Sequence, residues 1–108
     1  MLAEVALKDP VAPADLAELK QRAAILLARG DLEGTRTLLD AALDALPEDA
    51  DLLALRGACR ARQGELGEAV QDLATAVMSR PQDWELLNSF AVHLQKLQMF
   101  DEAVVFHV

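Results

Sequence analysis

Similar residues recur along this chain at a spacing of 34 positions, and this spacing limits the fold more than any other feature of the sequence. The clearest pairs are Gly30 and Gly64, Leu32 and Leu66, Leu39 and Leu73, Ala42 and Ala76, and Pro47 and Pro81. A third copy starts at Trp84, where FDEAVVF echoes the earlier LGEAVQDL. A short repeat cannot bury its apolar face alone, so stacked copies must build one continuous core.

Each copy is expected to hold two helices. Apolar residues recur at spacings of three and four, and no segment alternates as a half-buried strand would. Glycines and prolines punctuate the pattern, which predicts helices over 15–29, 32–46, 50–62, 66–79 and 83–97 and a sixth from residue 100. Asp15 with Glu18 resembles a capping box, and the acidic turns PEDAD and RPQDWE are expected to cap the helices that follow them.

Composition and charge exclude several classes of protein. Of the 108 residues 53% are hydrophobic and 26% charged, which suffices for a folded core, while the abundance of Ala and Leu favours helices. The net charge of −8 argues against binding to nucleic acid or to a membrane surface. Charged residues interrupt every apolar stretch before it reaches the length of a membrane span. The opening MLAEVALKDP does not have the pattern of a secretory signal, and a single cysteine, Cys59, fits a reducing compartment. We therefore expect a cytoplasmic protein.

The period and the residue types resemble the tetratricopeptide repeat family. The family places small residues where its paired helices approach closely, as at Ala23, Gly57 and Ala91, at Ala69 and Ala103, and at Ala42 and Ala76. Pro47 and Pro81 match its closing proline, and Thr35 replaces a small residue. The resemblance implies an all-α fold, a right-handed superhelical stack of antiparallel helix pairs, with about two and a half repeats. We expect an arm and linker over 1–13 and a repeat domain over 14–108, with units 16–49, 50–83 and an incomplete 84–108.

Two further positions depart from the family pattern. Arg60 stands where the family usually has an aromatic residue, and its charge is expected to reach outward over its apolar stem. His107 replaces a large apolar residue in the unfinished last helix.

The resemblance also implies a binding surface, because the family builds its concave groove from one face of each first helix. Carried over to this chain, that face comprises Lys20, Ala24, Leu27, Ala28, Asp51, Ala54, Ala58, Ala61, Arg62, Glu85, Asn88, Val92, Gln95 and Lys96. Its floor is small and apolar and its margins are charged, which suits an extended apolar peptide or an amphipathic helix. Helix propensity and tight packing explain the same alanines without a partner.

The inventory of reactive residues does not support an enzyme, a cofactor or a metal site. Cys59 and His93 stand one repeat apart at the same aligned position, so a buried structural cysteine is the favoured interpretation over a thiol–imidazole pair. With His107 they offer no short-spaced pair of zinc ligands. The carboxylate clamp of chaperone-binding members is also not matched, because only Lys20 fits it, while Ala24, Leu55, Glu85 and Ser89 do not.

Three functions remain open from the sequence. The first is a protein-interaction scaffold or adaptor that binds an apolar segment or helix of another protein in its groove. The second is a small cytosolic chaperone similar to those of bacterial type III secretion, which hold apolar segments of export substrates. The third is a structural segment that self-assembles through the apolar C-terminal helix, as a homo-oligomer or within a longer array. Residues 1–7 are a further candidate occupant of the groove.

Overall fold

The computed structural model describes residues 13–106, with side chains described over 15–99. Within this range five helices follow one another and no strand forms: α2 (Pro13–Ala28), α3 (Leu32–Ala45), α4 (Ala50–Arg62), α5 (Leu66–Ser79) and α6 (Trp84–Phe106). The all-α fold class is confirmed. α2 begins at Pro13, inside the predicted linker, because proline suits the first turn of a helix. Residues 1–12 and His107 lie outside the described residues, and so does the predicted binding of residues 1–7 to the groove.

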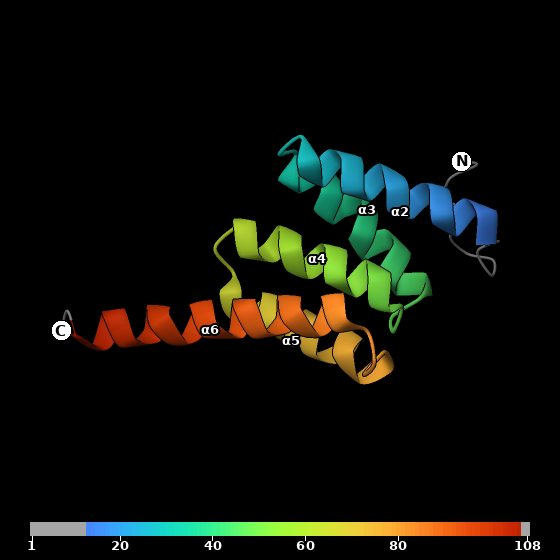
Figure 1. Cartoon of the computed structure of the whole chain (residues 1–108). Coiled ribbons are helices and arrows are strands. Elements are labelled where there is room, and N and C mark those ends of the chain that lie inside the picture. The colour runs from blue at the N-terminus through green and yellow to red at the C-terminus, as the bar shows by residue number, and fades with distance from the viewer. Residues whose placement is uncertain (1–12, 107–108) are drawn as a thin grey trace.

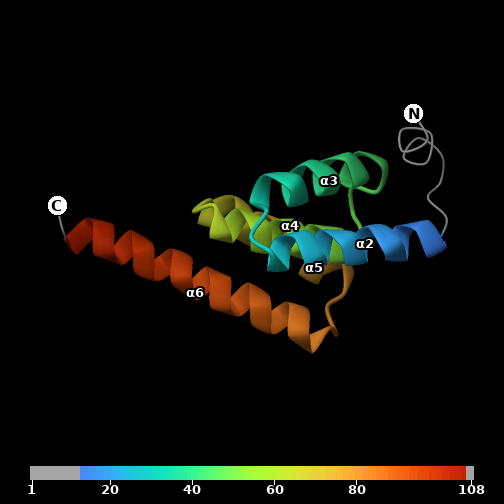
Figure 2. The same ribbon diagram turned by 90° about the horizontal axis from the view of Figure 1, so that it is seen from above.

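The helices are arranged in two layers. α2, α4 and α6 run in the same direction on one side of the molecule, and α3 and α5 run antiparallel to them behind (Figure 1). The view from above agrees, with α3 on the far side of α2 (Figure 2). Each unit therefore contributes its first helix to the front layer, which is the arrangement that the repeat predicts.

Two glycines end the first helices of units one and two. Gly30 has φ +83° and Gly64 has φ +85°, a left-handed conformation that side chains disfavour. At each site the next residue donates a backbone hydrogen bond back into the helix, from Asp31 to the carbonyl of Leu26 and from Glu65 to that of Arg60. These bonds satisfy carbonyls at the helix end and reverse the chain within a few residues.

The predicted break between a fifth and a sixth helix is wrong. α6 runs without interruption for 23 residues, through the turn expected near residues 98–99. The reason is that Gln98 stands in the register of Gly30 and Gly64. Glutamine is a good helix former and a poor left-handed residue, so this position continues the helix rather than ending it.

Small residues sit where first and second helices cross in units one and two. Ala23, Gly57 and Ala69 are buried, as the resemblance implies. A Cβ atom on Gly57 would lie 3.1 Å from Cγ of Leu73 and 3.2 Å from the carbonyl oxygen of Ala69, so α4 and α5 approach too closely for a larger residue. The aligned Ala91 is exposed, since α6 continues instead of turning back to cover it.

Aspartates cap three helices, which confirms the interpretation of the acidic turns. Asp49 accepts a hydrogen bond from the backbone N–H of Leu52 at 3.1 Å, and Asp83 accepts one from that of Leu86 at 3.1 Å. Asp31 does the same for Gly34 at 2.9 Å. Each carboxylate satisfies an N–H that the helix leaves unpaired and lies at the positive end of the helix dipole.

Candidate functional site

The residues predicted to line the groove all belong to α2, α4 and α6, the front layer of Figure 1. We call them, with the exception of Leu27, the first-helix surface. Its exposed members are Ala24, Ala28, Arg62, Glu85, Asn88, Val92, Gln95 and Lys96, and its half-buried members are Lys20, Asp51, Ala54, Ala58 and Ala61. The interior of this surface therefore consists of alanines and Val92, while charged residues stand at its ends.

Leu27 is a correction to the predicted set. Its side chain is only 8% exposed and belongs to the apolar core, so it cannot form part of an open floor. Its backbone carbonyl still reaches the surface, because Nη1 of Arg62 donates a 2.6 Å hydrogen bond to it. That bond connects the end of α2 to the end of α4.

An ion-paired group holds the other end of the first-helix surface. Nζ of Lys20 lies 2.9 Å from a carboxylate oxygen of Asp51 and 3.2 Å from one of Asp49, and Arg80 donates to Asp51 at 2.9 Å. The hydrogen bond from Lys20 lowers the pKa of Asp51, with Arg80 adding to the effect against the opposing cost of burial. Burial disfavours the charged Lys20, but the two aspartates outweigh it and raise the pKa of the ammonium.

Three charged residues of the first-helix surface already make hydrogen bonds within the chain, and this limits which ligands the surface can bind. Lys20, Asp51 and Arg62 are each bonded within the chain, so they join neighbouring units before they could bind a ligand. The alanines between them carry no polar side-chain atom. The interior of this surface is therefore suited to apolar contact.

The sequence analysis missed one large apolar residue on this surface. Trp84 is 82% exposed at the start of α6, and it precedes Asn88 and Val92 at helical spacings of four and eight. These spacings place the indole on the same side of α6 as the predicted members. The repeat alignment does not indicate this residue, because Trp84 aligns with Ala50, a small residue that is buried in unit two. Met78, 81% exposed near the end of α5, is a large exposed apolar side chain outside this surface.

A charged cluster on α4 and α5 was also missed. Asp72 is 5% exposed and accepts a bidentate pair of hydrogen bonds from Arg56, at 3.0 and 2.9 Å, and one from Arg60 at 3.1 Å. Arg56 also reaches Asp40 of α3 at 3.1 Å. The prediction that Arg60 extends outward is wrong, because a buried carboxylate attracts it inward. This cluster ties three helices together and leaves no free nucleophile or base.

Cys59 is buried, with an exposed fraction of 0%, and its Sγ lies 3.3 Å from the carbonyl oxygen of Leu32. Burial raises the pKa of the thiol, which keeps it in its unreactive form. Nδ1 of His93 lies 2.7 Å from the carbonyl oxygen of Ser89 in its own helix. Among the described residues no group of three or more potential metal ligands occurs.

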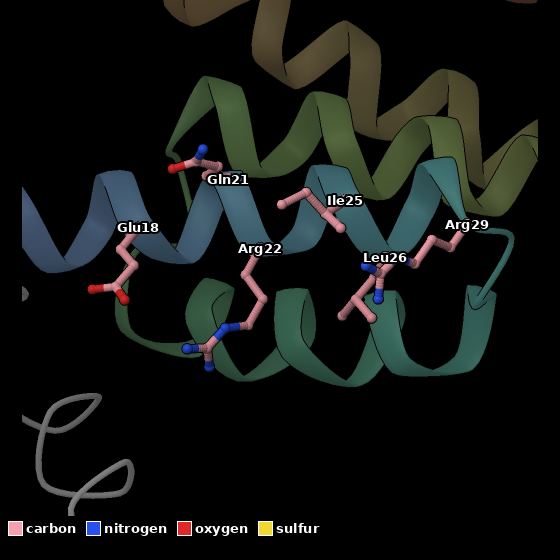
Figure 3. A pocket seen from close by; sticks show the side chains of 6 residues that line it. All are labelled: Glu18, Gln21, Arg22, Ile25, Leu26 and Arg29. Atoms are coloured by element: carbon pink, nitrogen blue, oxygen red, sulfur yellow. The ribbon is translucent and has the colours of Figure 1, made fainter.

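Two depressions occur outside the first-helix surface. One, of about 270 Å³, lies on α2 between Glu18 and Arg29 (Figure 3). The other, of about 290 Å³, lies beside the turn from Ala45 to Asp49. Neither is lined by a member of the first-helix surface. Within the described residues, no helix is long and apolar enough to cross a membrane.

Comparison with known families supports the repeat assignment. The family described as Tetratricopeptide repeat matches residues 26–91, which is more than half of the chain. The match covers the end of α2 and the first turns of α6, with all of α3, α4 and α5 between them. No curated protein and no solved structure matches the chain.

Proposed function

Because the chain belongs to the tetratricopeptide repeat family, whose members are non-catalytic protein-interaction scaffolds, we propose that its first-helix surface binds an apolar peptide or amphipathic helix of another protein. The proposal extends the general role of the family to a surface and to a class of ligand. It places no reaction on the chain, and it locates the protein in the cytosol, where a lone cysteine stays reduced.

One observation carries the proposal: apolar side chains stay accessible along the whole front layer. Ala24 and Ala28 are exposed on α2, Ala58 is half-buried on α4, and Val92 and Trp84 are exposed on α6. Small residues leave room for the larger anchors of a partner, and Trp84 can supply an aromatic contact of the kind that dominates many interfaces. Association would bury this strip without breaking any of the ion pairs at its ends.

The test compares two charged variants in an affinity capture from the lysate of the source organism. Ala58→Glu places a carboxylate in the middle of the first-helix surface, whereas Gln71→Glu adds the same charge at an exposed position of α5, on the rear layer. We expect the native chain and Gln71→Glu to capture the same partner and Ala58→Glu to lose it. Circular dichroism establishes that both variants keep their helices.

A captured partner is then titrated against the purified chain. The chain has one tryptophan, so binding over the first-helix surface should shift the emission of Trp84 to shorter wavelength as the indole is desolvated. Capture that is equal in all three proteins, or binding that leaves the emission unchanged, would contradict the proposed surface. A client carrying an export signal would identify a secretion chaperone, and recovery of the chain alone would favour self-assembly.

A further inference from the structure

The depression on α2 lies on the outer end of the helix stack. It is lined by Glu18, Gln21, Arg22, Ile25, Leu26 and Arg29. Figure 3 shows these side chains on the near side of α2, with α4 above the helix and α3 below it. Ile25 is 45% exposed there, and Leu26 is half-buried. We call these six residues the outer face of α2.

The next unit shows what this face is built to contact. One repeat further on, Ile25 corresponds to Cys59 and Arg22 corresponds to Arg56. Cys59 is completely buried, with its Sγ at the carbonyl of Leu32 in α3, and Arg56 pairs with Asp40 of α3. The second helix of the preceding unit thus covers this face in α4. The same face of α2 lacks such a cover among the described residues.

The register of the repeat identifies a segment for that position. Pro13 stands 34 residues before Pro47, and Pro47 stands 34 before Pro81, so the residues ahead of Pro13 occupy the register of a second helix. In that register Val5 corresponds to Leu39 and Leu73, which are 0% and 1% exposed. Ala3 corresponds to Thr37 and Gln71, which are both exposed.

We propose that residues 1–7, MLAEVAL, dock on the outer face of α2, at the position that the register of the repeat gives to a second helix. The apolar match ends there, because Lys8 stands where Ala42 and Ala76 are buried. Val5 would contact the region of Ile25 and Leu26. This placement covers the end of the core and leaves the first-helix surface open to a partner.

The test measures how well residues 1–7 shield a thiol on α2. Ile25→Cys reports on the outer face of α2, and Ala24→Cys, one residue away, reports on the first-helix surface. The native Cys59 is buried, so it should react slowly, and its rate is measured on the parent chain and subtracted. Each reporter is combined with Val5→Glu, which charges the position expected to be buried. The matched control is Ala3→Glu, which adds the same charge to the same segment at a position expected to face solvent.

The measured quantity is the rate of modification by a small maleimide. We expect Val5→Glu to speed the labelling of the Ile25→Cys reporter severalfold, while Ala3→Glu leaves that rate unchanged and the Ala24→Cys reporter responds to neither substitution. If Val5→Glu exposes the Ala24→Cys reporter alone, the segment lies on the first-helix surface and the proposal fails. It also fails if neither reporter responds. Protection of the Ile25→Cys reporter that rises with protein concentration and ignores Val5→Glu would assign the outer face to a second copy of the chain.

Discussion

At the scale of single residues, the carboxylate of Asp72 joins α4 to α5 through hydrogen bonds from Arg56 and Arg60. Its side chain is 6% exposed, and those of Arg56 and Arg60 are 20% and 16% exposed, so solvent screens the three charges little. Nε of Arg60 is buried without a hydrogen-bond partner and lies 3.6 Å from a carboxylate oxygen of the exposed Glu68, while Nη1 donates to Asp72. Removing the charge of Asp72 would leave the two arginines with only the more exposed carboxylates of Asp40 and Glu68 as partners.

We therefore expect Asp72→Asn to lower the free energy of unfolding by about 2 kcal/mol, because the amide keeps the shape but loses the charge that both arginines face. Urea denaturation followed by circular dichroism gives the value. Asp44→Asn is the matched control, since Asp44 is exposed and has no ion pair among the described residues, and it should change stability by less than about 0.5 kcal/mol. Equal losses in the two variants would mean that net charge, not this cluster, is responsible.

The same cluster shows why part of the site was not predictable from sequence. A repeat alignment compares positions, and Arg56 aligns with Arg22 in one neighbour and Phe90 in the other, while Asp72 aligns with Leu38. The charged contact is therefore specific to the second unit. A signal did exist, since an arginine and an aspartate sixteen residues apart on paired helices face each other, but it requires the crossing geometry of α4 and α5 to be known.

At the scale of helices, the sequence predicted the bounds of α3, α4 and α5 closely because short-range chemistry sets them. Gly64 ends α4 by its left-handed backbone, and Asp49 starts it by capping. The predicted break in α6 is wrong because the likeness to unit two indicates a turn there, whereas residue 98 is glutamine and not the glycine of units one and two. A repeated pattern indicates where a turn belongs, but the residue at the turn decides whether the chain makes it.

Gln98→Gly should restore the turn that α6 lacks. Glycine makes the left-handed conformation accessible and weakens the helix interior by about 1 kcal/mol relative to alanine, so both effects favour an end near residue 97. Backbone NMR shifts should lose their helical values at residues 98–99 in this variant and keep them in Gln98→Ala. Helical shifts that persist through residue 106 in both variants would show that glycine alone cannot end the helix.

The crossing of α4 and α5 should tolerate no bulk at Gly57. Gly57→Val would force the valine against Leu73 and the carbonyl of Ala69, and overpacking of this kind costs roughly 1–3 kcal/mol. Gly67→Val is the matched control on α5, where an added Cβ meets nothing within 4 Å. Thermal unfolding should show a lower midpoint for Gly57→Val alone. If the unfolding midpoint of Gly67→Val falls by the same amount, the loss is due to the low helix propensity of valine and not to the crossing of α4 and α5.

At the scale of the whole molecule, Asp51 connects unit one to both helices of unit two. It belongs to α4 of unit two and accepts hydrogen bonds from Lys20 of α2 and from Arg80, in the turn that leads to α6. Stacked repeats are held together mainly by contacts between neighbours, so a carboxylate that joins units one and two adds to their cooperativity. The repeat could predict the stacking, but this link depends on side chains that do not repeat.

The shared carboxylate also predicts how stability responds to acid. The pKa of Asp51 in the folded chain lies below its ordinary value of 3.8, so the unfolded chain takes up the proton first as the pH falls. The contribution of Asp51 is thus fully present above pH 3.8 and disappears as the pH falls through the lower folded value. Because the side chain is 45% exposed, we expect this contribution to be only about 0.5–1 kcal/mol.

Asp51→Asn should accordingly lower the free energy of unfolding at pH 7 and reduce its decline between neutral and acid pH, because the titrating group is gone. Urea denaturation of both proteins across this range supplies the two curves, which should converge at the acid end, where the native carboxylate is protonated. Glu65, whose pKa Arg36 also lowers, titrates in both proteins and keeps a common slope in each curve. Glu48→Gln removes a charge from an exposed neighbouring position and should run parallel to the native curve. Curves for Asp51→Asn that stay equally separated at every pH would show that the asparagine perturbs packing, and that units one and two are not coupled through this charge.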